Sequence, residues 1–151
     1  MDYLIHDTEH FTIKQSDMYR IPGYLIVESK ADVTTVAGFD AESSSDLLQC
    51  VARAEALLQQ VLQPERVYIM KFGEMNPRVH FHVFPRTRHI GDAYRVAAGD
   101  EAPYSGARLV DWIWTHDESL GFTDQDIQSF IDAARNHVND PTQNGTVSTD
   151  E

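Results

Sequence analysis

Residues 76–86 of this 151-residue chain read NPRVHFHVFPR. Polar and apolar side chains alternate through this stretch, as they do on a strand that buries one face. Arg78, His80 and His82 would then share one face, and the valines and phenylalanine between them would face the core. Same-face neighbours on a strand lie about 7 Å apart, so both imidazoles could reach one bound group.

The segment before this strand has the composition of a second strand. Residues 66–72 are rich in β-branched and aromatic side chains and are followed by Gly73. A short turn containing Asn76 separates the two runs. Two strands joined by about five residues predict a β-hairpin.

The remaining elements follow from periodicity and from capping signals. Residues 10–14 and 24–28 read as short strands, and residues 40–62 as an amphipathic helix. A second amphipathic helix is expected over residues 123–138, whereas residues 108–115 could form helix or strand.

The composition is that of a soluble globular protein, with 42% apolar and 24% charged residues. No apolar run is long enough to span a bilayer, and the N-terminus has no signal-peptide core. A single cysteine, Cys50, excludes an internal disulfide. We expect a cytoplasmic protein with one domain over residues 1–138 and a polar, disordered tail over residues 139–151.

The charge is unevenly distributed along the chain. The net charge of −12 argues against nucleic-acid binding, which depends on Lys and Arg to neutralise phosphates. Residues 66–95 nevertheless carry six Lys and Arg against two acidic residues, a balance of +4. A basic island in an acidic chain favours a small anion as ligand, although a chance cluster on a solvated face is the plain alternative.

From the residues alone, the His80 and His82 pair has three interpretations. The pair could simply occupy the wet face of an amphipathic strand. It could hold a metal, but a third ligand would have to come from Glu74, His89 or Asp92, whose spacing fits no metal motif. It could also act on phosphate, because neutral imidazole attacks phosphorus and a nearby cation stabilises the developing charge.

The stretch from Arg78 onward resembles the motif of the histidine triad (HIT) family. That motif is His-φ-His-φ-His-φ-φ, often followed by Pro-Arg, where φ is apolar. The Pro-Arg pair fixes the register, so that His80 matches the middle histidine and His82 the third. Residues 21–27 (IPGYLIV) resemble the family's PGφφLVφP strand. The resemblance covers about residues 10–90.

The resemblance implies an α+β fold, with a five-stranded antiparallel sheet, two principal helices and continuation of the sheet across a homodimer. It implies a hydrolase or nucleotidyl transferase that acts at an α-phosphate through a nucleotidyl-histidine, without a metal or other cofactor. The substrates expected are dinucleoside polyphosphates, phosphoramidates and related nucleotides. His80 would be the nucleophile, and His82 would bind the phosphate or assist the leaving group. The order of segments adds candidate substrate-binding residues: Phe11, Ile13, Asp17, Lys71, Gly73 and Asn76.

Arg78 is the main departure from the motif, because it stands where the first histidine is expected. A permanent cation there would keep His80 neutral and nucleophilic, and a guanidinium could grip phosphate oxygens. The alternative is a nucleotide-binding protein that turns over slowly. Ser29, where the family usually has proline, is a smaller departure.

Overall fold

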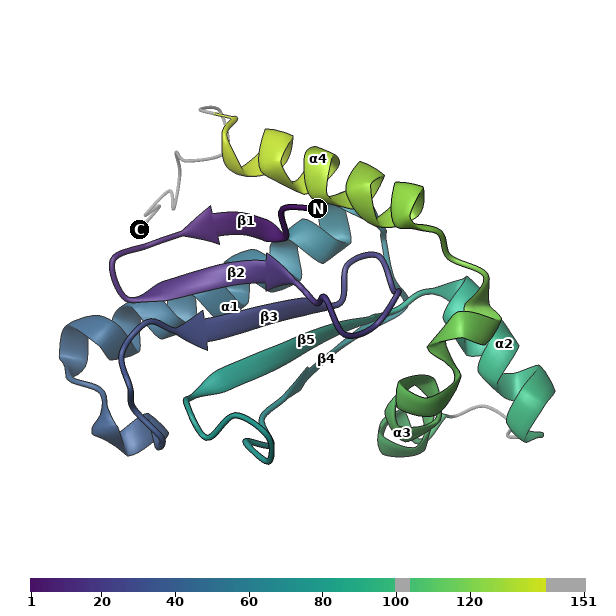
Figure 1. Cartoon of the computed structure of the whole chain (residues 1–151), viewed down its shortest axis with the longest axis horizontal. Coiled ribbons are helices and arrows are strands. Elements are labelled where there is room, and N and C mark those ends of the chain that lie inside the picture. The colour runs from purple at the N-terminus through teal and green to yellow at the C-terminus, as the bar shows by residue number, and fades with distance from the viewer. Residues whose placement is uncertain (100–103, 141–151) are drawn as a thin grey trace, which may run out of the picture.

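The computed structural model describes residues 1–99 and 104–140, and its centre is one antiparallel sheet. The strands lie in the order β1-β2-β3-β5-β4 (Figure 1), and each pairs antiparallel with its neighbour. Their bounds are β1 (Leu4–Asp7), β2 (Phe11–Gln15), β3 (Leu25–Ser29), β4 (Arg66–Met70) and β5 (His80–Arg86).

Helices cover the sheet unequally. Their bounds are α1 (Ala41–Val61), α2 (Arg88–Ala98), α3 (Gly106–His116) and α4 (Asp124–Val138), with short 3₁₀ turns η1 (Val36–Gly38) and η2 (Asp117–Leu120). Helix α1 crosses the face that we term the back, and α4 lies along β1 (Figure 1). Helices α2 and α3 form a separate group beyond one end of the strands. The chain therefore has the expected α+β architecture.

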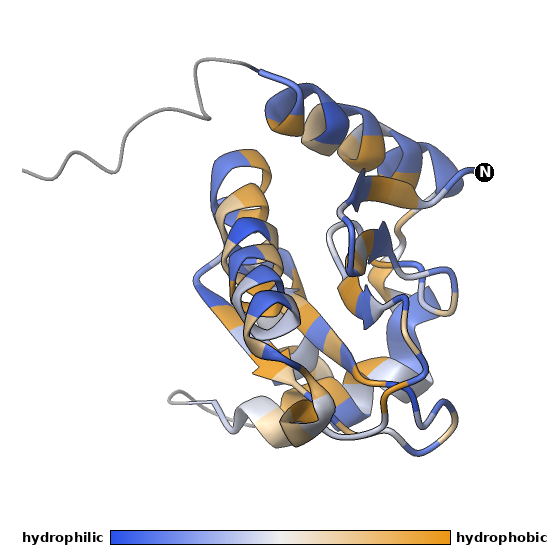
Figure 2. Cartoon of the chain, turned by 90° about the vertical axis from the view of Figure 1, so that its left-hand side faces the viewer, coloured by the Kyte–Doolittle hydropathy of each residue, from blue (hydrophilic) through white to orange (hydrophobic). Residues whose placement is uncertain are grey.

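Strand β5 divides its side chains between two hydrophobic cores. Val83 is fully buried on the back with α1, and Phe81 packs against the same core. His80, His82 and Phe84 alternate with them and face the front. Phe84 is fully buried in the second core, which α2 and α3 build, whereas the two histidines are only partly buried. Figure 2 shows hydrophobic and hydrophilic residues alternating around the helices.

Most of the expected elements are confirmed. Strands β4 and β5 form the hairpin, with Arg66 paired to Arg86. Helix α1 begins after Asp40, whose carboxylate accepts a hydrogen bond from the backbone N–H of Ser43. Helix α4 begins with a capping box at Thr123. The segment whose type was open, residues 108–115, is helical within α3.

Three features differ from the sequence expectation. The sequence did not predict the edge strand β1, because its four residues are too few to show the alternation of a strand. The sequence did not predict helix α2, because Gly91 weakens its helical pattern. Glycine at this position leaves room for the ring of Tyr104. Strand β5 begins at His80, so Arg78 precedes the strand and lies in the turn, where its N–H bonds to Asn76 Oδ1.

Two other expectations concern the C-terminal tail and a membrane-spanning segment. Most of the expected tail, residues 141–151, lies outside the described residues. Among the described residues no helix has both the length and the apolar character needed to cross a bilayer.

Gly23 is required by the loop that enters β3. Its φ is +81°, and an added Cβ would lie 2.5 Å from Leu62 Cδ1. We expect Gly23→Ala to lower the free energy of unfolding by about 2–4 kcal/mol, because backbone strain and overpacking combine. Urea denaturation would measure the change.

Gly121→Ala is the matched control, because Gly121 also has positive φ but open space around it. It should cost only about 1 kcal/mol. Equal losses in the two variants would show that packing around Gly23 does not matter.

Candidate functional site

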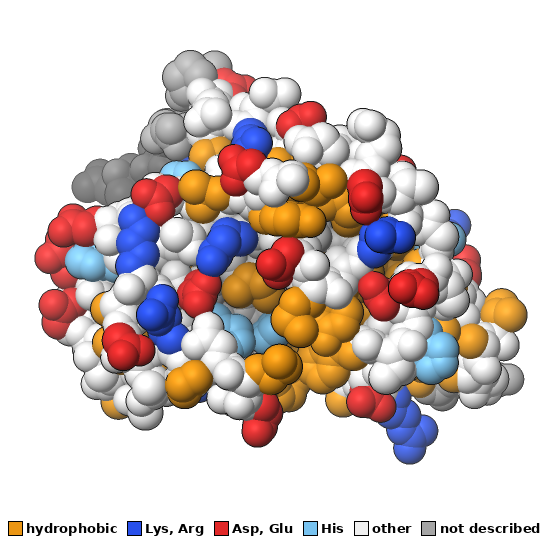
Figure 3. All heavy atoms as spheres, viewed as in Figure 1, with side chains coloured by type: hydrophobic (Ala, Val, Ile, Leu, Met, Phe, Trp, Pro, Cys, Tyr) orange, Lys and Arg blue, Asp and Glu red, His pale blue; other side chains and the backbone are white. Residues whose placement is uncertain are grey.

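A cavity of about 700 Å³ opens on the front of the sheet, where α2 and α3 do not cover it. Three strands supply its floor: Lys14 from β2, Ile26 and Glu28 from β3, and His80 and His82 from β5. The register places Ile26 opposite His82 and Glu28 opposite His80. Figure 3 shows histidine side chains in pale blue at the base of this hollow.

Aromatic side chains form the wall beside His82. Phe72 and Trp114 meet edge to face with ring centroids 5.3 Å apart, and Tyr19 stacks on Trp114 at 6.4 Å. Large exposed hydrophobic side chains also line the cavity: Met1, Leu4, Met18 and Met75. An exposed apolar concentration of this kind marks a binding surface.

The main chain of Arg78 fixes the tautomer of His80. The His80 Nδ1 atom lies 2.8 Å from the Arg78 carbonyl oxygen. A carbonyl can only accept a hydrogen bond, so Nδ1 must carry the proton. The neutral ring therefore keeps its lone pair on Nε2, which is the form that can act as a nucleophile.

Tyr24 and Trp114 fix the opposite tautomer at His82. The indole N–H of Trp114 donates to the Tyr24 hydroxyl oxygen at 2.9 Å, and that oxygen lies 3.0 Å from His82 Nδ1. Tyr24 is fully buried, and of these two partners only His82 Nδ1 can accept its proton. His82 therefore carries its proton on Nε2.

Burial keeps this pair of groups uncharged at neutral pH. Burial among Tyr24, Phe72 and Trp114, with a smaller contribution from His80, lowers the pKa of His82 to about 4. Burial also raises the pKa of Tyr24 above its ordinary value, so its hydroxyl stays protonated and able to donate. The His80 and His82 rings lie 5.0 Å apart, one with a lone pair on Nε2 and the other with a proton there.

The Arg78 side chain does not line this cavity. Its Nε lies 3.9 Å from Asp32 Oδ1. Burial acts to raise the pKa of Glu28, but the hydrogen bonds from Lys14 and Asn76, with a smaller contribution from the Arg78 charge, lower it overall. The expected common face of Arg78, His80 and His82 depended on the strand starting at Arg78, two residues earlier than it does. Arg78 thus contacts His80 through its backbone carbonyl.

The other expected site residues divide into two groups. Asp17, Gly73 and Asn76 line the cavity, and Lys71 is exposed beside it without lining it. Phe11 and Ile13 are fully buried in the core with α1 and offer no surface to a ligand. They lie on the back face of β2, and its front face presents Lys14 to the cavity.

The basic island of residues 66–95 does not form a basic site. Arg86 and Arg88 lie within 4 Å of Glu65, and Arg95 lies over the Tyr104 ring. None of the six Lys and Arg side chains of the island lines the cavity. The cluster therefore reflects structural pairing and solvent exposure.

Among the described residues, none of the three candidate third ligands, Glu74, His89 and Asp92, lies within reach of both cavity histidines. His89 lies on α2, and its Nε2 lies 2.8 Å from the Leu120 carbonyl. Within residues 1–99 and 104–140, the sole group of three potential ligands in reach of one another is Glu9, His10 and Glu42. That group contains neither histidine of the cavity.

Comparison with known proteins identifies the fold. No family model and no curated protein matches the sequence. A histidine triad protein from Bradyrhizobium japonicum superposes with a TM-score of 0.60 at 19% identity, covering 90% of this chain and 88% of that one. The chain has the histidine triad fold. A HIT-like protein involved in cell-cycle regulation from Bartonella henselae matches with a TM-score of 0.58 at 15% identity, covering 90% and 86%.

A third solved structure is similar over the same extent. A hypothetical histidine triad nucleotide-binding protein from Sulfolobus tokodaii matches with a TM-score of 0.58 at 12% identity, covering 91% of this chain and 84% of that one. These superpositions establish the fold at low sequence identity. The chemistry has to be argued from the site itself.

Sequence reasoning missed several residues in and around this cavity. Tyr24, Ile26 and Glu28 share a face by strand alternation, so they could have been found once β3 was paired with β5. Trp114 comes from α3, about thirty residues after the motif, and carried no signal beyond its apolar surroundings.

The Tyr24 hydroxyl provides a test of the His82 tautomer. Tyr24→Phe removes the only donor described for His82 Nδ1 and leaves the Trp114 N–H unpaired. We expect the fraction of His82 that carries its proton on Nε2 to fall, because the ring loses the hydrogen bond that fixes its tautomer. Long-range ¹⁵N–¹H correlation spectra at pH 7 would measure this fraction.

Tyr19→Phe is the matched control, since Tyr19 stacks on Tyr24 without a hydrogen bond to either histidine. A loss of equal size in both variants would contradict a role for the Tyr24 hydroxyl.

The lowered pKa of His82 makes a pH-dependent prediction. In the unfolded chain the ring takes up a proton near pH 6.5, whereas in the folded protein it does so near pH 4. Protonation therefore favours unfolding, and stability is lost as pH falls from about 6.5 to 4. NMR titration should show the His82 ring neutral down to about pH 5; a midpoint at 6.5 would contradict the burial argument.

Proposed function

We propose that this chain binds a nucleotide and cleaves a bond to its α-phosphate, with His80 as the nucleophile. The observation that carries the proposal is the pair of opposite tautomers at the cavity floor. One imidazole offers a lone pair and its neighbour offers an N–H, which are the two groups required to attack phosphorus and to bind its oxygens. The histidine triad fold supports this proposal by placing both rings on the strand that carries the motif.

The proposed step begins with attack of His80 Nε2 on the α-phosphorus. A new N–P bond forms, and the bond to the leaving group breaks with its electron pair going to the leaving atom. The imidazole becomes cationic, and the Arg78 carbonyl stabilises it through the hydrogen bond from Nδ1. Water then hydrolyses the nucleotidyl-histidine and returns His80 to its starting form.

His82 is proposed to bind a non-bridging phosphate oxygen. Its ring is neutral and donates through Nε2, so it stabilises negative charge without giving up its proton. A neutral imidazole is a very weak acid, and the leaving group would take its proton from solvent. Of the two roles that the resemblance allowed for His82, the geometry favours phosphate binding.

The aromatic wall is proposed to hold the nucleobase. Phe72, Trp114 and Tyr19 present ring surface at the side of the cavity, next to His82. Stacking of a base on such rings contributes about 1–3 kcal/mol. The homodimer that the resemblance implies and the cytoplasmic location expected from the sequence stay predictions.

The nucleophile is tested by His80→Ala. We expect turnover of adenosine 5′-phosphoramidate to fall about 10³-fold or more, because the covalent route is lost. The dissociation constant for AMP should change less than about threefold, since His80 supplies little of the cavity's apolar surface. Rapid quench with labelled substrate should give an acid-labile nucleotidyl-protein in the wild type and none in the variant.

Arg78→Ala is the informative comparison, because alanine retains the backbone carbonyl that holds His80. Its loss of turnover should stay below about tenfold. Absence of both turnover and a nucleotidyl-protein in the wild type would instead favour a nucleotide-binding protein without catalysis.

A further inference from the structure

We propose that the substrate carries its negative charge on a single phosphorus, with an uncharged or cationic leaving group, and is not a dinucleoside polyphosphate. This inference rests on the proposed function, because it assumes that phosphorus reacts at His80. It concerns which members of the broad nucleotide class the cavity accepts. The argument comes from the charges that line the cavity.

The ionisable side chains of the cavity are mostly acidic. Asp2, Asp17, Glu28 and Glu74 line it, and Lys14 is the one Lys or Arg side chain among the described residues that does so. Lys14 is already neutralised, because its Nζ lies 2.7 Å from Glu28 Oε2. Lys71 is exposed beside the cavity but is not part of its wall, so no unpaired Lys or Arg side chain from the described part of the chain lines it.

Two of the carboxylates have no cationic partner. Asp2 forms an ion pair with Arg135 at 2.7 Å, and Glu28 is paired with Lys14. Asp17 and Glu74 are exposed, and the described residues supply neither with an ion pair. The electrostatic balance of the side chains around the cavity is therefore negative.

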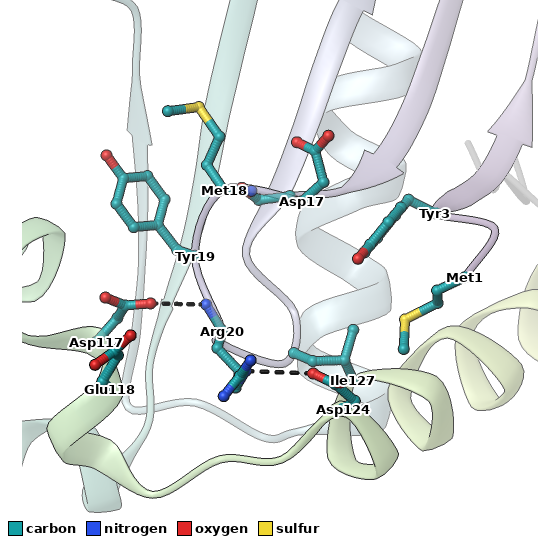
Figure 4. A pocket seen from close by; sticks show the side chains of 11 residues that line it. Met1, Tyr3, Asp17, Met18, Tyr19, Arg20, Asp117, Glu118, Asp124 and Ile127 are labelled. Atoms are coloured by element: carbon teal, nitrogen blue, oxygen red, sulfur yellow. Dashed lines mark hydrogen bonds and ion pairs between the residues drawn. The ribbon is translucent and has the colours of Figure 1, made fainter.

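An adjoining cleft of about 180 Å³ extends this acidic surface. It shares Asp17 with the main cavity and adds Asp117, Glu118 and Asp124 (Figure 4). Arg20 does not offset them: its Nε lies 3.3 Å from Asp124, and its backbone N–H bonds to Asp117 (Figure 4). A ligand that extends past Asp17 would meet further negative charge.

The side-chain donors left for phosphate are neutral. His82 offers Nε2–H, and three hydroxyl-bearing residues, Tyr3, Ser16 and Tyr19, line the cavity. The Asn76 amide uses one of its two N–H groups on Glu28. Such donors suit the two non-bridging oxygens of one phosphodiester or phosphoramidate.

A dinucleoside tetraphosphate would bring about four negative charges into the same space. No unpaired Lys or Arg side chain among the described lining residues compensates them, and each further charge would be repelled by Asp17 and Glu74. Apolar surface from Met18, Phe72 and Met75 instead fits an uncharged leaving group. Specificity would thus come from like-charge rejection as well as from attraction.

The test uses three AMP phosphoramidates with the same P–N bond and different tails. Pentylamine gives a neutral tail, 1,5-diaminopentane a cationic tail and 5-aminopentanoate an anionic tail; diadenosine tetraphosphate is the fourth substrate. We expect kcat/KM for the anionic tail to be about tenfold below the neutral one, and that for the tetraphosphate to be lower still. The cationic tail should match or exceed the neutral one.

Charge variants locate the effect in the cavity. The double variant Asp17→Asn/Glu74→Gln should raise the anionic-to-neutral ratio of kcat/KM about threefold or more. The matched control is Glu55→Gln/Asp92→Asn, which removes the same charge from exposed positions on α1 and α2. This control should leave the ratio unchanged.

The outcomes separate this inference from the proposed function. Two results would overturn the inference alone. One is turnover that depends on His80 but favours the tetraphosphate. The other is an anionic-to-neutral ratio of kcat/KM that Asp17→Asn/Glu74→Gln does not alter. Binding constants in His80→Ala that follow the charge order would support the charge selectivity of the cavity. If the wild type showed no turnover, the proposed chemistry would be overturned while this selectivity stood. Neither binding nor turnover of any of the four substrates would overturn both.

Discussion

The antiparallel register between β3 and β5 determines where the two histidines point. It sets Ile26 against His82 and Glu28 against His80, and it places all four side chains on the front of the sheet. The alternate residues of β5 fill the core with α1, so a shift of one residue would bury the imidazoles and expose the valines and phenylalanine between them. The position of the cavity and the chemistry of its floor both depend on this pairing.

The main chain explains how the site accommodates Arg78, at a position where the resemblance to the histidine triad motif leads to the expectation of a histidine. The contact with His80 is made by the backbone carbonyl of residue 78, which every amino acid possesses. The Arg78 guanidinium lies near Asp32, outside the cavity lining. The Arg78 side chain therefore neither supplies nor removes the hydrogen-bond partner that fixes the tautomer of His80. The two histidines are fixed by different groups, His80 by main chain and His82 by Tyr24 with Trp114.

The sequence predicted the fold best where a local pattern was long or strongly marked. The hairpin that ends in Arg86, helix α1 and helix α4 each carried several periods or a capping signal. Strand β1 was too short to show one. The candidate site was predicted at His80 and His82, where alternation and motif agree, and failed at Phe11 and Ile13, which follow the correct strand but occupy its buried face.

Of the patterns in the sequence, local charge was the poorest guide to the site. A positive balance over residues 66–95 indicated an anion site, yet these cations pair with Glu65, lie on aromatic surface or remain exposed, because proximity in sequence does not place side chains in one cavity. The carboxylates around the cavity come from the segment before β1, the loop after β2, strand β3 and the turn before β5, and only the folded chain brings them together.

The central claim is that His80 and His82 are held in opposite neutral tautomers. Long-range ¹⁵N–¹H correlation spectra of the two rings at pH 7 would test it directly. The account predicts a protonated Nδ1 with an unprotonated Nε2 for His80, and the reverse for His82. The same tautomer at both rings, or a protonated Nε2 at His80, would contradict it.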